Sequence, residues 1–240
     1  MKKSKIAING FFGRMGQAIY LLSKEEGFNV TVGCDQKEKV TSQYEIQLSD
    51  DLSKNPDLFD VVIDFSLPEP CVNIVKTCEK INKPITIGTT GFKQEQKDYL
   101  VSASKNIPLL LAPNMSLGVN ASLESISDLS KILTNYDVHI EETHHKNKLD
   151  SPSGTAIKIA EVVAEARGIN PEDIKITSLR EEGEIGIHKT VFKSDDDEII
   201  LYHNAFNRKI FAMGALESSQ WIVQQKPGLY TYKDFMRSMT

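Results

Sequence analysis

The sequence contains no apolar run that approaches the roughly 18–20 residues of a membrane-spanning helix. Its first residues, Met1 to Lys5, lead directly into an apolar strand pattern and lack the apolar core and cleavage site of a signal peptide. It also lacks an excess of basic residues, since the net charge is −5 and the isoelectric point is near 5.6. Such an acidic balance argues against nucleic acid or an anionic membrane as the main partner. We therefore expect a cytoplasmic protein with neither of these partners.

Cysteine is scarce, and the chain has only Cys34, Cys71 and Cys78. An odd number without metal-ligand spacing is typical of reduced thiols in a cytoplasmic protein and not of a zinc site. We therefore expect no structural metal. The sequence has no internal repeat and no low-complexity tract, and 240 residues are enough for one or two domains with a large core.

Short apolar strands alternate with helices in the first half of the chain. Alternation of this kind predicts a parallel sheet with helices on both faces, which is a Rossmann-type α/β fold. A polar stretch at 36–48 is expected to be a loop. The predicted strands are 5–9, 29–35, 60–66, 85–88 and 108–112, and the predicted helices are 15–26, 69–82 and 93–105. These elements define a first domain at 1–115.

The second half has a different pattern, with several strands and little helix between them. This favours an α+β domain with a mixed or antiparallel sheet. We place this domain at 116–214 and expect residues 215–240 to return to the first domain. The predicted helices are 120–133, 155–167 and 208–224, and the predicted strands are 136–144, 174–181, 186–193 and 198–206.

A glycine-rich turn follows the first predicted strand. Gly10, Gly13 and Gly16 have the spacing G-x-x-G-x-x-G, a variant of the dinucleotide-binding fingerprint, and Arg14 adds a cation. Glycines let the backbone turn tightly and approach a pyrophosphate at the helix N-terminus. Asp35 ends the second strand, 25 residues after Gly10, where such folds place an acceptor for ribose hydroxyls. The alternative is an ordinary strand–helix turn and a surface aspartate.

The stretch 141–156 combines three chemical features. His144 or His145 can exchange a proton near neutral pH, Lys148 supplies a positive charge, and residues 151–155 resemble a cap that begins a helix. A helix N-terminus attracts anions, so the combination suits a small substrate with carboxylates. A histidine pair alone is more often structural than catalytic, and two histidines could ligate a metal ion. Adjacent strand residues point to opposite faces, however, so both rings would rarely reach one ion.

These motifs together resemble the 4-hydroxy-tetrahydrodipicolinate reductases, also called dihydrodipicolinate reductases, over essentially the whole chain. The strongest element runs from Glu142 to Ala156 and matches the family signature E-x-H-H-x-x-K-x-D-x-P-S-G-T-A. The other elements, in the family's order, are Gly10 to Gly16, Asp64-Phe65-Ser66, Gly88 to Gly91, Ala112 to Met115, Arg180 with Gly183, and Gly186 to Phe192.

The resemblance implies a nicotinamide-dependent reduction and a role for each matched residue. His144 takes the position of the proton donor or acceptor and Lys148 that of a second proton donor. A small dicarboxylate substrate is expected at His145, Ser153, Gly154 and Thr155. The nucleotide-binding positions are Gly10, Phe11, Phe12, Gly13, Arg14, Met15, Asp35, Gly88, Thr89, Thr90, Ala112, Pro113, Asn114 and Met115. The resemblance also implies that 116–214 is a substrate-binding and oligomerisation domain and that the protein is a homotetramer.

The residues near the expected ribose site favour neither NADH nor NADPH alone. Asp35 favours NADH because its charge repels the extra phosphate of NADPH, and Gln36 stands where the family often has a basic residue. Lys37, Lys39 and Arg14 offset this repulsion, so dual use of NADH and NADPH is expected.

Two other functions remain open from the sequence. An aspartate-semialdehyde-type dehydrogenase needs a nucleophilic cysteine in its second domain, whereas every cysteine here lies at or before Cys78. A non-catalytic dinucleotide sensor would leave His144 and Lys148 without a task. Glu217 stands where relatives often carry a basic residue, and we assign it no role.

Overall fold

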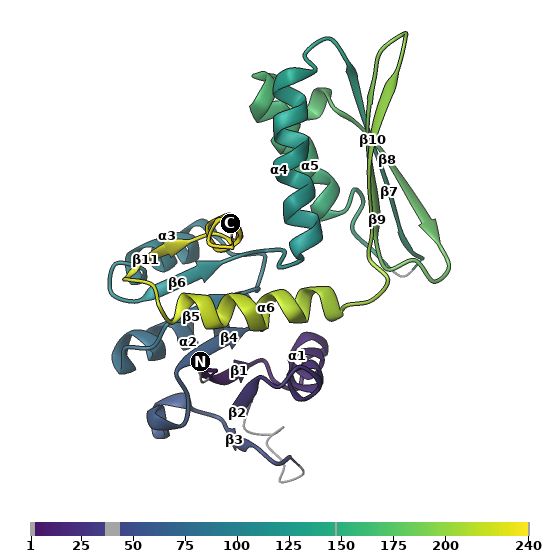
Figure 1. Cartoon of the computed structure of the whole chain (residues 1–240). Helices are drawn as coiled ribbons and strands as arrows, with labels where there is room; N and C mark the ends of the chain where they lie inside the picture. Colours follow the sequence, from purple (N-terminus) through teal and green to yellow (C-terminus); the bar gives the residue numbers. More distant parts are fainter. Residues whose placement is uncertain (1–2, 37–43, 147, 240) are drawn as a thin grey trace. The chain divides into compact units, whose positions relative to one another are not determined.

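The computed structural model describes residues 3–36, 44–146 and 148–239. Contacts divide the chain into two compact units (Figure 1). Unit 1 comprises Met1–Met115 and Lys209–Thr240, and unit 2 comprises Ser116–Arg208. The chain returns to unit 1 at residue 209, whereas the sequence analysis placed this return at 215. The return coincides with the start of helix α6, which runs without a break from Lys209 to Ile222.

Unit 1 is built on a seven-stranded parallel sheet with the strand order β11-β6-β5-β4-β1-β2-β3. The sheet confirms the predicted Rossmann-type arrangement. Its strands are β1 (Lys5–Asn9), β2 (Asn29–Cys34), β3 (Gln47–Ser49), β4 (Val61–Asp64), β5 (Ile85–Ile87), β6 (Pro108–Leu111) and β11 (Gly228–Tyr230).

Helices cover both faces of this sheet because successive strand residues alternate between two apolar cores. Ile6 and Ile8 of β1 pack in one core with residues of α1 (Arg14–Glu25), α6 and α7 (Tyr232–Arg237). Ala7, between them, belongs to the opposite core with residues of α2 (Pro68–Ile81) and α3 (Gln94–Ala103). Two short 3₁₀ turns, η2 (Leu52–Lys54) and η3 (Pro56–Leu58), connect β3 to β4.

Three elements of unit 1 differ from the sequence prediction. The stretch predicted as a loop at 36–48 runs into strand β3, which pairs with β2 through Val32 and Gln47, while residues 37–43 lie outside the described part. Strand β11 and helix α7 were not predicted. Each of these strands has only three residues, which is too short for a periodic pattern to stand out.

Unit 2 is a four-stranded mixed sheet with the order β10-β9-β7-β8, as the α+β prediction requires. Helices α4 and α5 lie on one side of it (Figure 1). Ile140 and Phe192 point from the sheet into the core beneath these helices, beside Ile126 and Ile159. The elements are α4 (Leu117–Ile132), β7 (Asp137–His145), α5 (Gly154–Arg167), η4 (Pro171–Asp173), β8 (Lys175–Glu181), β9 (Ile187–Lys193) and β10 (Glu198–Asn204).

Helix α4 begins three residues before the predicted start at 120, because Ser116 caps it by accepting a hydrogen bond from the Val119 N–H at 3.2 Å. None of the helices in the described ranges combines the length and the apolar character that a membrane span requires.

Candidate active site

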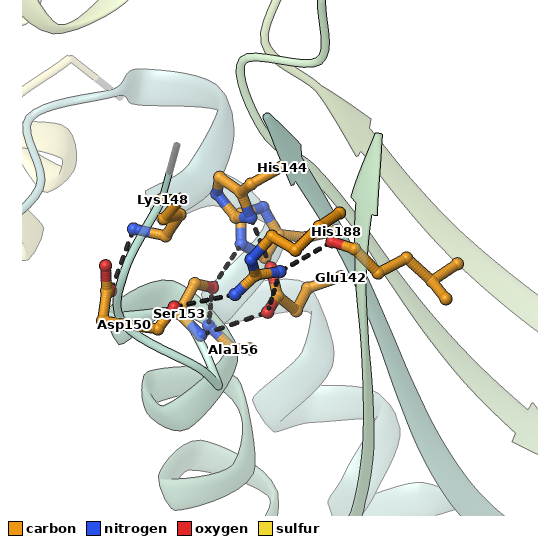
Figure 2. Close-up of polar contacts among 9 residues, drawn as sticks. Glu142, His144, Lys148, Asp150, Ser153, Ala156 and His188 are labelled. Carbon is orange, nitrogen blue, oxygen red and sulfur yellow. Dashed lines mark hydrogen bonds and ion pairs between the residues drawn. The ribbon is translucent and has the colours of Figure 1, made fainter. Parts of the chain in front are cut away.

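The side chains of Glu142 and His144 leave the same face of β7 as Ile140, toward the helices, because they are alternate residues of one strand. Both are buried, with exposed fractions of 0% and 7%. Figure 2 shows Nδ1 of His144 hydrogen-bonded to Oε2 of Glu142. A carboxylate and an imidazole therefore form a pair that is shielded from water.

The other oxygen of Glu142 joins two more elements to this pair. Oε1 accepts a hydrogen bond from Nη1 of Arg180 on β8 at 3.0 Å and one from the Ser153 N–H at 3.3 Å. Nη2 of Arg180 donates to the Asp150 carbonyl at 2.7 Å. One carboxylate thus connects two neighbouring strands and the loop that leads into α5.

Electrostatic effects on this pair partly cancel. Burial raises the pKa of Glu142, but hydrogen bonds from Ser178, Arg180 and His144 outweigh it, so the pKa lies below its usual range. Burial lowers the pKa of His144, the Glu142 carboxylate opposes this, and Lys148 and Arg180 add to the lowering. These shifts favour an ionised Glu142 and a neutral His144 at pH 7.

The loop after β7 brings the predicted cation and the start of α5 to the same place. Nζ of Lys148 lies 2.9 Å from Oδ2 of Asp150 (Figure 2), and this ion pair lowers the pKa of Asp150. Ser153 is the N-cap of α5, and its hydroxyl accepts a hydrogen bond from the Ala156 N–H at 3.2 Å. Lys148 and the positive end of α5 therefore flank His144.

Gly154 is the first residue of α5 and is exposed. A Cβ built at this position would meet no atom within 4 Å. The backbone here is therefore open to a ligand, and the substrate contact at Gly154 stays a prediction. Ser153 differs: it is 2% exposed, its N–H is directed at Glu142 and its hydroxyl serves the cap. Its position suits a residue that supports the first turn of α5 better than the expected direct contact with substrate.

The structure adds a second buried histidine that the sequence did not single out. His188 on β9 places Nε2 3.1 Å from the Ser153 hydroxyl oxygen, and its ring meets that of His144 edge to face at 5.2 Å between centroids. Burial, then the charge of His144, lowers the pKa of His188 to about 4. The pairing of β7 with β9 sets His188 directly opposite Glu142.

His145 follows His144 on β7 and therefore faces the other side of the sheet. Its Nδ1 is buried without a hydrogen-bond partner among the described residues. No group of three or more histidine, cysteine or acidic side chains in the described ranges is arranged to hold a metal ion.

Unit 1 contains a cavity of about 520 Å³ at the carboxyl ends of β1, β2 and β4. Asn9, Gly10, Gly13, Asp35 and Ser66 are among its lining residues. Gly10 has a φ of +77°, and a Cβ there would lie 2.5 Å from the Phe65 carbonyl oxygen, so only glycine fits. Gly13 is the N-cap of α1. Helix dipole, glycine turn and acidic residue therefore suit a dinucleotide.

The other predicted nucleotide-binding residues have several different environments. Arg14, Thr90 and Pro113 are exposed, and Phe12, Met15 and Asn114 are partly exposed. Phe12 donates its N–H to Oδ2 of Asp35 at 2.9 Å, which joins the glycine turn to the acidic residue. Five positions are buried and can reach a ligand mainly through their backbone: Phe11, Gly88, Thr89, Ala112 and Met115.

A buried aspartate that the sequence gave no role connects the loops of this cavity. Asp64 is 0% exposed and accepts hydrogen bonds from Asn9 Nδ2 at 2.6 Å, Ser66 Oγ at 2.7 Å and Thr89 Oγ1 at 2.6 Å. These three residues follow or end β1, β4 and β5. Asp64 therefore fixes the loop after β4 relative to the loops after β1 and β5, which carry predicted nucleotide-binding residues.

The thiols do not fit a cysteine-dependent dehydrogenase. Cys34, Cys71 and Cys78 are all unpaired and buried, and burial raises the pKa of each, that of Cys34 to about 12. A buried neutral thiol is a poor nucleophile.

Comparison with known families gives a match to both parts of the chain. The model of the N-terminal part of dihydrodipicolinate reductase matches residues 4–115, and that of its C-terminal part matches residues 118–236. The 4-hydroxy-tetrahydrodipicolinate reductase of Bdellovibrio bacteriovorus is 37% identical, covering 98% of this chain and 97% of the relative. The enzyme of that name from Buchnera aphidicola subsp. Cinara cedri is 33% identical, with coverages of 99% and 98%.

Solved structures agree with this result. A dipicolinate-bound dihydrodipicolinate reductase from Paenisporosarcina sp. TG-14 superposes with a TM-score of 0.84 at 26% identity, covering 96% of this chain and 98% of that one. An aspartate semialdehyde dehydrogenase II from Vibrio cholerae superposes with a TM-score of 0.55 at 10% identity, which shows a shared fold alone. The chain therefore belongs to the 4-hydroxy-tetrahydrodipicolinate reductase family.

Proposed function

We propose that His144, Lys148 and the N-terminus of α5 perform the substrate chemistry of the family reaction in this chain. The protein is an NAD(P)H-dependent oxidoreductase of lysine and diaminopimelate biosynthesis, which reduces 4-hydroxy-tetrahydrodipicolinate to tetrahydrodipicolinate. The reaction consumes one hydride and one proton and releases one water. The observation that carries the residue assignment is the buried Glu142–His144 pair beside Gly154, the exposed first residue of α5.

His144 is the proton-exchanging group in this proposal. Burial lowers its pKa and favours the neutral form, but a dicarboxylate bound beside it adds negative charge and raises its pKa. Substrate binding and protonation of His144 are therefore coupled. Lys148, whose charge lies close enough to lower the pKa of His144, attracts the same anion and supplies a second proton donor.

The substrate carboxylate lies against Gly154 and Thr155 in this proposal. Backbone N–H groups at a helix N-terminus and the dipole of α5 both favour an anion. Gly154 leaves room for it, because no atom lies within 4 Å of a Cβ position there. Ser153 holds the turn from behind, and His145 remains a proposed substrate contact on family resemblance alone.

A nicotinamide dinucleotide supplies the hydride when it is bound. The residues that would hold it are those of the cavity in unit 1, with Gly10 to Met15, Asp35, Gly88 to Thr90 and Ala112 to Met115. We propose that both NADH and NADPH serve. Asp35 lines the cavity and disfavours the extra phosphate, whereas the exposed Arg14 favours it. Lys37 and Lys39, the other expected phosphate contacts, lie outside the described residues.

Cofactor choice is tested by measuring kcat/KM with each nucleotide at two salt concentrations. Exposed charge contacts contribute of order 1 kcal/mol or less, so the two values should differ by less than about a hundredfold. Salt should weaken NADPH more than NADH because it screens the extra contact. A thousandfold preference in either direction would rule out dual use.

We also propose a homotetramer in the cytoplasm. The sheet face of unit 2 that points away from α4 and α5 exposes large apolar side chains, among them Leu179, Ile200 and Tyr202, which are 44%, 44% and 59% exposed. Association between copies would cover this face. The three unpaired thiols fit a reducing compartment. Light scattering should give about four times 26.9 kDa, and a stable, active monomer would contradict the proposal.

The proposed residue roles are tested with His144→Ala and Lys148→Ala. Loss of a general acid typically lowers the rate 10²–10⁴-fold. Each variant should therefore show a strongly reduced kcat in an assay of NAD(P)H oxidation coupled to the upstream synthase, while nucleotide affinity stays normal. Near-normal turnover at saturating substrate would remove the residue concerned from the chemistry. Absence of turnover in the wild-type protein would favour a nucleotide sensor.

A further inference from the structure

We propose that Glu142 is the positioning residue of this site and that it orients His144 and the first turn of α5 through one buried carboxylate. The inference rests on the proposed role of His144 and adds a residue to it. Glu142 does not itself meet the substrate in this proposal, since its side chain is 0% exposed. Its effect must therefore pass through the groups it holds.

The first of these groups is the imidazole of His144. An ionised carboxylate can only accept hydrogen bonds, so Nδ1 of His144, which is bonded to Oε2, must carry the hydrogen. Neutral His144 is therefore fixed in the Nδ1–H tautomer, and Nε2 is the atom left to exchange a proton with substrate.

The ionised state of Glu142 is maintained by its other partners. Nη1 of Arg180 and the Ser153 N–H donate to Oε1, and Ser178 lies opposite Glu142 in the pairing of β7 with β8 and contributes a hydrogen bond. A buried carboxylate without such donors would be neutral, and a neutral acid could donate to Nδ1 and reverse the tautomer.

The second group is the N-terminus of α5. Ser153 gives its N–H to Glu142 while its hydroxyl accepts from the Ala156 N–H and contacts Nε2 of His188. The carboxylate that orients His144 therefore also fixes the residue immediately before Gly154. The geometry therefore makes the positions of His144 Nε2 and of the N-terminus of α5 depend on the same carboxylate, that of Glu142.

The tautomer of His144 gives a direct test that does not need activity. Nitrogen NMR on histidine-labelled protein, at a pH above the pKa of His144, should show Nδ1–H in the wild type. In Glu142→Gln the amide oxygen is held by Arg180, so the amide N–H groups face Nδ1 and His144 should change to the Nε2–H form. A wild-type His144 in the Nε2–H form, or a tautomer that is unchanged in Glu142→Gln, would overturn the proposal.

A kinetic cycle separates positioning from a general structural role. Glu142→Gln should lower kcat, by no more than the 10²–10⁴-fold expected for His144→Ala. The double variant should have the kcat of His144→Ala, because the effect passes through His144. Losses that multiply would show that Glu142 acts independently. Glu161→Gln, the same change on the exposed side of α5, serves as the control with unchanged kcat.

Two outcomes distinguish this inference from the proposed function. If His144→Ala retains normal turnover, the catalytic role of His144 fails, and the tautomer measurement still decides whether Glu142 positions it. If Glu142→Gln does not fold, the wild-type tautomer decides together with Arg180→Lys. That variant keeps the charge but loses the two-pronged contact with Glu142 and the Asp150 carbonyl, and it should lower kcat with the same dependence on His144.

Discussion

Replacement of Gly154 by alanine separates substrate binding from folding more cleanly than any other change in the site. Gly154 is the first residue of α5, is exposed, and has open space around its Cβ position. Alanine is a better helix former than glycine by roughly 0.5–1 kcal/mol in a helix interior. The free energy of unfolding of Gly154→Ala should therefore be unchanged or raised by up to about 1 kcal/mol.

The same methyl group stands where the proposed substrate carboxylate approaches the backbone. A hydrogen bond to a charged group contributes about 1.5–3 kcal/mol, and 1.4 kcal/mol corresponds to about tenfold in affinity. We expect KM to rise roughly ten- to hundredfold. The carboxylate takes no part in bond changes, so its contact is equal in the ground and transition states and kcat should change little.

The assay follows NADH oxidation at varied substrate concentration, beside chemical unfolding of the same preparations. The affinity for pyridine-2,6-dicarboxylate, a planar mimic of the product, should fall by the same factor as KM rises. Glu161→Ala, on the exposed side of α5, is the control and should change neither value. A stable Gly154→Ala protein with wild-type KM and mimic affinity would show that the carboxylate binds elsewhere.

Three further predictions concern titration and loop support. If His144 is the proton donor, activity should fall with rising pH. This fall should occur at lower pH in the kcat/KM profile than in the kcat profile, because burial lowers the pKa of His144 in the free protein and the bound dianion raises it. Profiles that fall at the same pH would refute the coupling. His188 has a folded pKa of about 4 against its ordinary 6.5, so the unfolded chain takes up the proton first as the pH falls. Between pH 6.5 and 4 the free energy of unfolding should therefore fall by about 3 kcal/mol more in the wild type than in His188→Gln. Parallel dependences of the two proteins on pH, measured by urea titration, would refute this. Asp64→Asn leaves one of three donors without an acceptor, so it should lower the free energy of unfolding by about 1–3 kcal/mol and weaken NADH binding as measured by fluorescence. Asp57→Asn, on the exposed surface, is the control and should do neither. Unaltered NADH affinity in Asp64→Asn would show that Asp64 does not support the nucleotide-binding loops.

The main sheet of unit 1 was predicted from the sequence because most of its strands are apolar runs that stand between helices with a 3.6-residue period. It did not predict β11, whose partner β6 lies more than a hundred residues earlier in the chain. Nothing local in Gly228–Tyr230 indicates that partner, and the three residues acquire a strand conformation from the sheet edge they join. The same holds for β3 beside β2.

The site shows the same division between local and distant information. His144, Lys148 and Gly154 were predicted because they lie in one segment whose residue types suit an anion and a proton. Arg180 and His188 come from other strands, and only the register of β7 with β8 and β9 brings them beside Glu142. One local signal for Glu142 was available: an acidic residue two positions from His144 and from Ile140 on a strand must share their buried face.

Among the described residues, Asp64 and Glu142 are the two acidic side chains with no exposed surface, and they solve the same physical problem in different units. A charge removed from water is tolerated only when several donors surround it. Each carboxylate therefore gathers groups from three segments: Asp64 the ends of β1, β4 and β5, and Glu142 strand β7, strand β8 and the cap of α5. Loops rich in glycine, serine and threonine have little apolar surface with which to fix their own positions. A buried carboxylate fixes them instead, and this explains why, in each unit, the acid lies behind the residues that are proposed to meet the ligand.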